Sequence, residues 1–109
     1  MKVYLSGPMT GYPENNYPLF RSVAGELRAA GHDVYDPSEF AWEGDVFPIG
    51  EAFLAYSAFI CAEAEAIVLL PGWEESLGVS AEVALAKNCG LQIFEYTSGC
   101  DLSLGQTTG

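Results

Sequence analysis

The sequence predicts an α/β fold, a parallel sheet with helices on both faces. Apolar runs typical of strands alternate with segments of helical periodicity, in the order strand, helix, strand, helix, strand, helix, strand. This alternation is typical of a parallel sheet with right-handed crossover connections. The run AIVLL at residues 66–70 is apolar throughout, as expected of a strand that is buried on both faces.

The first half of the chain predicts two strands with a helix between them. Residues 2–5 (KVYL) form a β-branched and aromatic run that is followed by a loop rich in Gly, Pro and Asn. Apolar residues recur at helical spacing over residues 19–30, after Pro18, which suits a first helical turn, and before Gly31. Residues 32–35 predict the second strand, and residues 39–49 predict a loop.

The second half predicts two further helices and two further strands. Residues 50–62 and 79–88 have helical patterns, and residues 66–70 and 91–96 predict strands. Residues 71–78 predict a loop. We therefore expect one domain over residues 1–96, with four to five strands, and a polar C-terminal tail over residues 97–109, which is either disordered or docked on a partner subunit.

Composition excludes several classes of function. The chain of 109 residues has a formal net charge of -11, which argues against binding to long nucleic acids and to anionic membranes. No apolar run approaches the roughly 20 residues of a membrane span. Three widely spaced cysteines and a single histidine predict neither a disulfide framework nor a metal site, so we expect Cys61 and Cys89 to be small core residues. We expect no cofactor and a cytoplasmic protein.

Ligands of such sheets bind beyond the carboxyl ends of the strands. Three loops lie there, and backbone N–H groups at a helix N-terminus could still hold one or two phosphates of a small ligand. A Trp in such a loop either stacks on a planar ring or covers the sheet edge. The candidate ligand-binding residues are Ser6, Gly7, Pro8, Met9, Asp36, Gly72, Trp73, Ser76 and Gly78.

Glu82 allows two interpretations. It falls in the first turn of the predicted helix over residues 79–88, where an acidic side chain interacts favourably with the helix dipole. It also lies one turn after a glycine loop, at the carboxyl end of the most buried strand. A carboxylate in that place could attack a sugar carbon and form a glycosyl-enzyme ester.

Two stretches of the sequence together resemble a known family. The first combines MKVYLSGPMTG with LRAAGHDVYDP, and the second is AIVLLPGWEESLGVSAEVALA. Both are similar to small phage and bacterial proteins of DUF4406, a domain family of unknown function. The proteins of this family are relatives of nucleoside 2-deoxyribosyltransferases. The resemblance covers most of residues 1–96. It implies a flavodoxin-like, Rossmann-like three-layer fold, Glu82 as nucleophile at C1′ of a deoxyribose, and Ser6 to Met9 lining the base and sugar pocket. Gly78 would let the backbone approach the sugar or a phosphate.

The sequence departs from the transferases at two acidic positions. These enzymes carry an Asp six residues before the nucleophile, where this chain has Ser76, and an acidic residue in the preceding helix, where Ser57 aligns. Cleavage of an N-glycosidic bond needs a proton for the leaving base as well as a nucleophile. Glu74, Glu75 or Asp36 are the candidates for supplying it.

Three functions therefore stay open. The protein is an enzyme that cleaves or transfers an N-glycosidic bond of a nucleoside or nucleotide; or it binds and sequesters a nucleotide signal, ADP-ribose-like or cyclic, without turnover; or it is an interaction module with a vestigial pocket. Trp42 and Phe47 would close the pocket as a lid, or come from a neighbouring subunit. The resemblance also implies a homodimer or tetramer, and the host cytoplasm if a phage encodes the protein.

Overall fold

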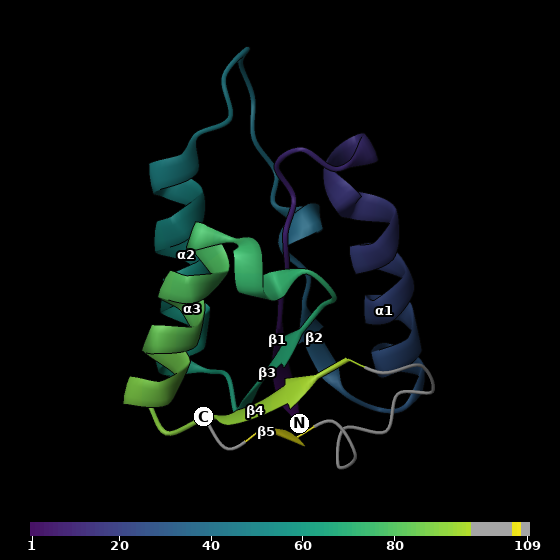
Figure 1. Ribbon diagram of the computed structural model, residues 1–109, viewed down its shortest axis with the longest axis vertical. Helices are drawn as coiled ribbons and strands as arrows, with labels where there is room; N and C mark the ends of the chain where they lie inside the picture. The colour runs from purple at the N-terminus through teal and green to yellow at the C-terminus, as the bar shows by residue number, and fades with distance from the viewer. Residues whose placement is uncertain (97–105, 108–109) are drawn as a thin grey trace.

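The computed structural model describes residues 1–96 and the backbone of residues 106–107 (Figure 1). The sheet has the order β2-β1-β3-β4-β5, and its first four strands are mutually parallel. They are β1 (Lys2–Ser6), β2 (Asp33–Tyr35), β3 (Ala66–Leu69) and β4 (Gln92–Glu95). The short β5 (Gln106–Thr107) pairs antiparallel with β4, inside the predicted tail; the rest of that tail lies outside the described residues.

Three helices cover the two faces of the sheet, which confirms the predicted α/β three-layer fold. In Figure 1, α1 (Tyr17–Ala29) stands on one side of the strands, and α2 (Ile49–Ala62) and α3 (Leu77–Asn88) stand together on the other. The side chains of β1 alternate between the two layers. Val3 and Leu5 pack in the core with α1, whereas Tyr4 packs in the core with α2 and α3.

The strand order places a crevice between β1 and β3. The chain leaves β1 for β2 on one side, then returns to form β3 on the other side of β1. Ser6 at the end of β1 is in register with Leu69 at the end of β3. The loops that follow these two strands therefore diverge from neighbouring points, and this is the position where open α/β sheets bind ligands.

The start of α3 differs from the prediction. The region predicted as a loop over residues 71–78 contains a short 3-10 helix, Trp73–Glu75, and α3 already begins at Leu77. Ser76 is the N-cap, and its hydroxyl accepts a hydrogen bond of 3.3 Å from the backbone N–H of Val79. Glu82 is consequently the sixth residue of α3 and lies outside its first turn, so the prediction of a first-turn position was wrong.

The burial of the two helical cysteines also differs from the expectation. The buried residues of α2 are Ala52, Tyr56 and Ile60, whereas Cys61, like Cys89, is exposed. The prediction of two core cysteines was therefore wrong. Apolar side chains occur on nearly all sides of this helix, so their spacing did not indicate which side faces the sheet. None of the helices in residues 1–96 is long and apolar enough to cross a membrane.

Candidate functional site

The carboxylate of Glu82 is held by two hydroxyl groups from β1. The Tyr4 hydroxyl donates to Oε2 at 2.7 Å, and the Ser6 hydroxyl donates to Oε1 at 2.6 Å. Tyr4 and Ser6 are two residues apart, so their side chains leave the strand on the same face. Helix α3 covers that face, and it presents Glu82 to both hydroxyls. A strand and a helix far apart in the sequence thus fix both oxygens of one carboxylate.

Burial controls the protonation of this group. Glu82 is 7% exposed, and this desolvation raises the pKa of its carboxyl group above the usual value. The hydrogen bonds from Ser6 and Tyr4 act in the opposite direction, because they stabilise the carboxylate form. Burial, followed by the nearby Glu82 charge, raises the pKa of the Tyr4 hydroxyl well above its usual value, which keeps Tyr4 a hydrogen-bond donor.

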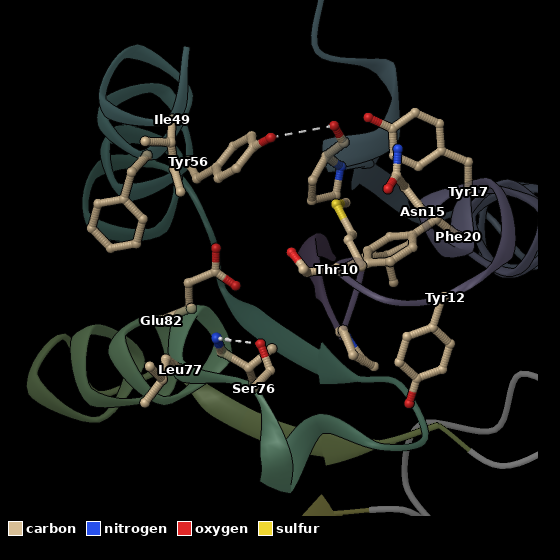
Figure 2. Close-up of a pocket in the computed structure, with 18 of the residues that line it drawn as sticks. Thr10, Tyr12, Asn15, Tyr17, Phe20, Ile49, Tyr56, Ser76, Leu77 and Glu82 are labelled. Carbon is tan, nitrogen blue, oxygen red and sulfur yellow. Dashed lines mark hydrogen bonds between the residues drawn. The ribbon is translucent and has the colours of Figure 1, made fainter. Parts of the chain in front are cut away.

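Glu82 lies in the wall of a pocket of about 880 Å³. In Figure 2 its carboxylate, carried by α3, points into the space between α2 on one side and the loop after β1 on the other. A volume of this size is in the range that binds small organic molecules. Eight aromatic side chains line the pocket: Tyr4, Tyr12, Tyr17, Phe20, Trp42, Phe47, Phe53 and Tyr56.

The structure brings together most of the predicted ligand-binding residues. Glu82 and six others line the same pocket, namely Gly7, Pro8, Met9, Gly72, Ser76 and Gly78. Ser6 does not line it but bonds to Glu82 beneath the surface. Trp42 and Phe47, predicted as a possible lid, both line it and pack edge-to-face with ring centroids 5.3 Å apart. The pocket thus draws on loops after β1, β2 and β3.

Asp36 and Trp73 are not among the lining residues. Asp36 is 3% exposed, and its Oδ1 accepts a hydrogen bond of 2.9 Å from the backbone N–H of Ser38, so it caps a short 3-10 helix. The indole N–H of Trp73 donates to Glu95 Oε1 at 3.0 Å. Of the two interpretations of the Trp, this contact with the last residue of β4 therefore favours a residue that covers the end of the sheet over one that stacks on a ligand.

The structure also shows which of the acidic side chains proposed to assist Glu82 line the pocket. Of the three proposed proton donors, Glu75 lines the pocket, whereas Glu74 and Asp36 do not. Asp45 lines it as well, from the loop before α2. Ser57 bonds to backbone carbonyls of its own helix, Phe53 and Leu54, and lies outside the lining. In the part of the chain that is described, no group of three or more His, Cys, Asp or Glu side chains could hold a metal ion.

Several lining residues escaped the sequence reasoning. Tyr4 was assigned to the strand alone, although its position two residues before Ser6 already placed both on one face. Tyr56 lies in the middle of α2, above Glu82 in Figure 2, and its hydroxyl donates to the Pro37 carbonyl oxygen at 3.5 Å. Asn15 comes from the turn before α1 and Tyr17 is the first residue of that helix, and neither position carries a motif. Only the tertiary fold brings these side chains to the pocket.

Comparison with known proteins places the chain in a family. No curated protein matches the sequence significantly. The model of a domain of unknown function, DUF4406, matches residues 1–95, which include all four parallel strands, the three helices and every residue that lines the pocket. This protein belongs to the DUF4406 family.

Proposed function

We propose that this protein binds a nucleoside or nucleotide in the pocket and cleaves or transfers its N-glycosidic bond, with Glu82 as the nucleophile. The observation that carries the proposal is the buried carboxylate of Glu82, whose two oxygens are positioned by Tyr4 and Ser6 at the wall of a pocket rich in aromatic rings. The resemblance of the stretch around Glu82 to the nucleoside 2-deoxyribosyltransferases, noted from the sequence, supports the same reaction.

The reaction would proceed in two steps. A Glu82 oxygen attacks C1′ of the sugar, the C1′–N bond breaks, and its electron pair leaves with the base. The base takes up a proton, for which Glu75 and Asp45 are the candidate donors in the pocket wall. Water or a second base then attacks C1′ of the ester and releases Glu82. Tyr4 and Ser6 would keep the carboxylate oriented through both steps, because each donates to a different oxygen.

One observation favours a second candidate function, binding without turnover. Both oxygens of Glu82 already accept a hydrogen bond, and burial favours its protonated form, which is a poor nucleophile. In this alternative the same pocket holds and sequesters the ligand, and Glu82 serves as a hydrogen-bonding group for a sugar hydroxyl.

Base release separates the two functions. The purified protein is incubated with a panel of nucleosides, mononucleotides and cyclic nucleotides, and the products are separated by chromatography. We expect free base from the wild type and a loss of at least about 1000-fold in Glu82→Gln, since removal of a nucleophile leaves little of the rate. Glu74→Gln, which neutralises a carboxylate outside the pocket, is the matched control and should keep full activity.

A covalent intermediate is the second readout. After acid quenching, intact-mass spectrometry should show the wild type carrying one sugar, and Glu82→Gln should show none. A ligand that stays bound through a spin filter and is released unchanged on heating would instead establish the sequestering protein. Base release that persists in Glu82→Gln would rule out the proposed nucleophile.

A further inference from the structure

The charges of the pocket are all of one sign. Three acidic residues line it, Asp45, Glu75 and Glu82, and no Lys, Arg or His does so. This statement holds for the entire chain, because its four Lys and Arg residues and its one His all lie within the described residues 1–96. No segment of the same chain outside the described part can add a basic side chain to this pocket.

None of the basic side chains lines the pocket, although Arg21 contacts Tyr17, which does. Arg28 pairs with Glu39 at 2.9 Å, and Lys2 pairs with Glu63 at 3.7 Å. The guanidinium of Arg21 lies 5.3 Å from the ring centroid of Tyr17 and donates to the Ser38 carbonyl oxygen. Lys87 lies in the last turn of α3, at the end opposite to Ser76 and the pocket. A phosphate group in the pocket would therefore meet acidic side chains and no Lys, Arg or His of the lining, which is unfavourable. Only backbone N–H groups at the start of α3, whose first turn lines the pocket, are left to bind it.

Aromatic faces surround the acidic groups. Tyr12 and Trp42 are each 40% exposed and line the pocket, so their rings are accessible to a ligand. In Figure 2, Tyr56 and Tyr17 project towards the central space from opposite sides, and Glu82 lies below them. Aromatic faces attract planar rings in general, and they attract positively charged rings most strongly.

We propose that the ligand of this pocket is a nucleoside without phosphate groups whose base carries a positive charge, such as an N-alkylated purine or a pyridinium nucleoside. This inference rests on the proposed function and narrows its substrate class. The carboxylates would stabilise the cation electrostatically, and the aromatic rings would stack on it.

A cationic base also simplifies the chemistry. When a Glu82 oxygen forms its bond to C1′ and the C1′–N bond breaks, the electron pair neutralises the positive ring, and the base leaves as a neutral molecule. No proton donor is needed. Water then hydrolyses the ester, so the sum is cationic nucleoside plus water giving neutral base, free sugar and one proton. The substitution of Ser76 and Ser57 for the acidic residues of the transferases is compatible with this reaction.

Binding tests the charge preference without interference from turnover. Glu82→Gln, which keeps the Asp45 and Glu75 side chains of the pocket wall, is titrated in low-salt, mildly acidic buffer with two matched pairs of probes. 7-Methylguanosine is compared with guanosine, and nicotinamide riboside with its 5′-phosphate. We expect 7-methylguanosine to bind at least about tenfold more tightly than guanosine, because its base is cationic. We expect nicotinamide riboside to bind at least about tenfold more tightly than its 5′-phosphate, which has the same cationic base and adds a phosphate. Both differences should shrink as salt screens the charges.

Variants at the pocket wall identify the groups responsible. Asp45→Asn and Glu75→Gln should each weaken binding of 7-methylguanosine about threefold and leave guanosine unchanged, because one partly solvated charge is removed. Glu43→Gln and Glu74→Gln neutralise neighbouring residues that do not line the pocket, and they should change neither Kd. If all four variants lose the same affinity for 7-methylguanosine, the general negative charge of the protein attracts the cation. That result would overturn the assignment of the preference to Asp45 and Glu75 in the pocket wall.

Turnover by the wild type separates this inference from the proposed function. Rates are divided by the uncatalysed rate of each nucleoside, because cationic nucleosides break down faster on their own. Greater acceleration for 7-methylguanosine than for guanosine, and for nicotinamide riboside than for its 5′-phosphate, supports both proposals. Suppose instead that base release depends on Glu82 but that guanosine is accelerated at least as much as 7-methylguanosine, or the 5′-phosphate at least as much as nicotinamide riboside. That result keeps the proposed function and overturns the preference for a cationic nucleoside without phosphate. Tight, selective binding of the cations without base release keeps the preference and overturns catalysis.

Discussion

The hydroxyl of Tyr4 is the group whose removal should be most informative about Glu82. It donates to Oε2 at 2.7 Å and lowers the pKa of the carboxyl group against the effect of burial. In Tyr4→Phe the pKa of Glu82 should rise further, because only Ser6 then stabilises the carboxylate. Since the nucleophile must be ionised, we expect the acid limb of the kcat/KM profile to move to higher pH, and the profile of base release against pH measures this shift.

Tyr35→Phe is the matched control for that change. Tyr35 stacks on Tyr4 with ring centroids 5.6 Å apart, so the variant loses a hydroxyl from the same aromatic cluster but keeps both hydrogen bonds to Glu82. Its acid limb should coincide with that of the wild type. An acid limb that moves equally in both variants would show that the cluster, and not the Tyr4 hydrogen bond, sets the ionisation of Glu82.

The raised pKa of Glu82 also predicts how stability depends on pH. The pKa of Glu82 is higher in the folded state than in the unfolded state, where it is about 4.3. At pH values between these two pKa values, the folded state therefore binds more protons than the unfolded state. The contribution of Glu82 to the free energy of unfolding should therefore be greatest below this window and decrease as pH rises through it. Denaturant unfolding of wild type and Glu82→Gln across this range measures the difference. A difference that grows with pH in favour of the wild type would contradict the prediction.

At the scale of elements, the first turn of α3 exposes its backbone to the pocket at a glycine, Gly78. Gly78 lines the pocket, and a Cβ atom added there would meet only the Ser76 hydroxyl, at 3.9 Å. Gly78→Ala should therefore fold normally, and it should gain up to about 1 kcal/mol because Ala is the better helix former. If a ligand approaches this backbone closely, the added methyl group should weaken binding at least about tenfold. Thermal unfolding and ligand titration of one variant measure both effects.

Gly72→Ala provides the contrast for that experiment. Gly72 has φ +87°, and a Cβ atom there would lie 2.6 Å from the Tyr12 hydroxyl. This substitution should lower stability as well as binding, since it strains the loop and displaces a side chain. If Gly78→Ala lowers stability as much as Gly72→Ala does, the inference that a methyl group fits at Gly78 without a clash is wrong. If it is stable and binds ligand with unchanged affinity, the ligand does not approach the start of α3.

At the scale of the whole molecule, the sequence was most informative about the parallel sheet and least about the pocket wall. The run at residues 66–70 and the alternating elements were sufficient to predict a parallel sheet, because burial on both faces leaves a continuous apolar run. The start of α3 was predicted two residues late, because the Ser76 cap is a single side chain inside a Gly-rich loop. Asn15, Asp45 and Tyr56 reach the pocket from three segments without motifs, so only the tertiary fold reveals them.

The formal net charge of -11 affects the folded protein as a whole. Fifteen acidic residues face only four Lys and Arg, so compact folding brings many like charges together, and this repulsion destabilises the folded state. Added salt should screen the repulsion and raise Tm by a few degrees. The effect should be concentrated below about 0.2 M NaCl, where the Debye length falls from about 30 Å at 0.01 M to about 8 Å.

The shape of that salt dependence distinguishes screening from a general solvent effect. Screening levels off once the Debye length is shorter than the spacing of surface charges, whereas preferential exclusion of a salt continues to raise stability at higher concentrations. A double variant Glu43→Gln and Glu74→Gln carries two fewer negative charges at exposed positions, so it should show a smaller rise of Tm over the same low-salt range. Calorimetry of both proteins in NaCl measures the two curves. A Tm that is flat below about 0.2 M in the wild type would mean that the acidic side chains lie too far apart to destabilise the fold, and the preference of the pocket for cations would then depend on its own three carboxylates alone.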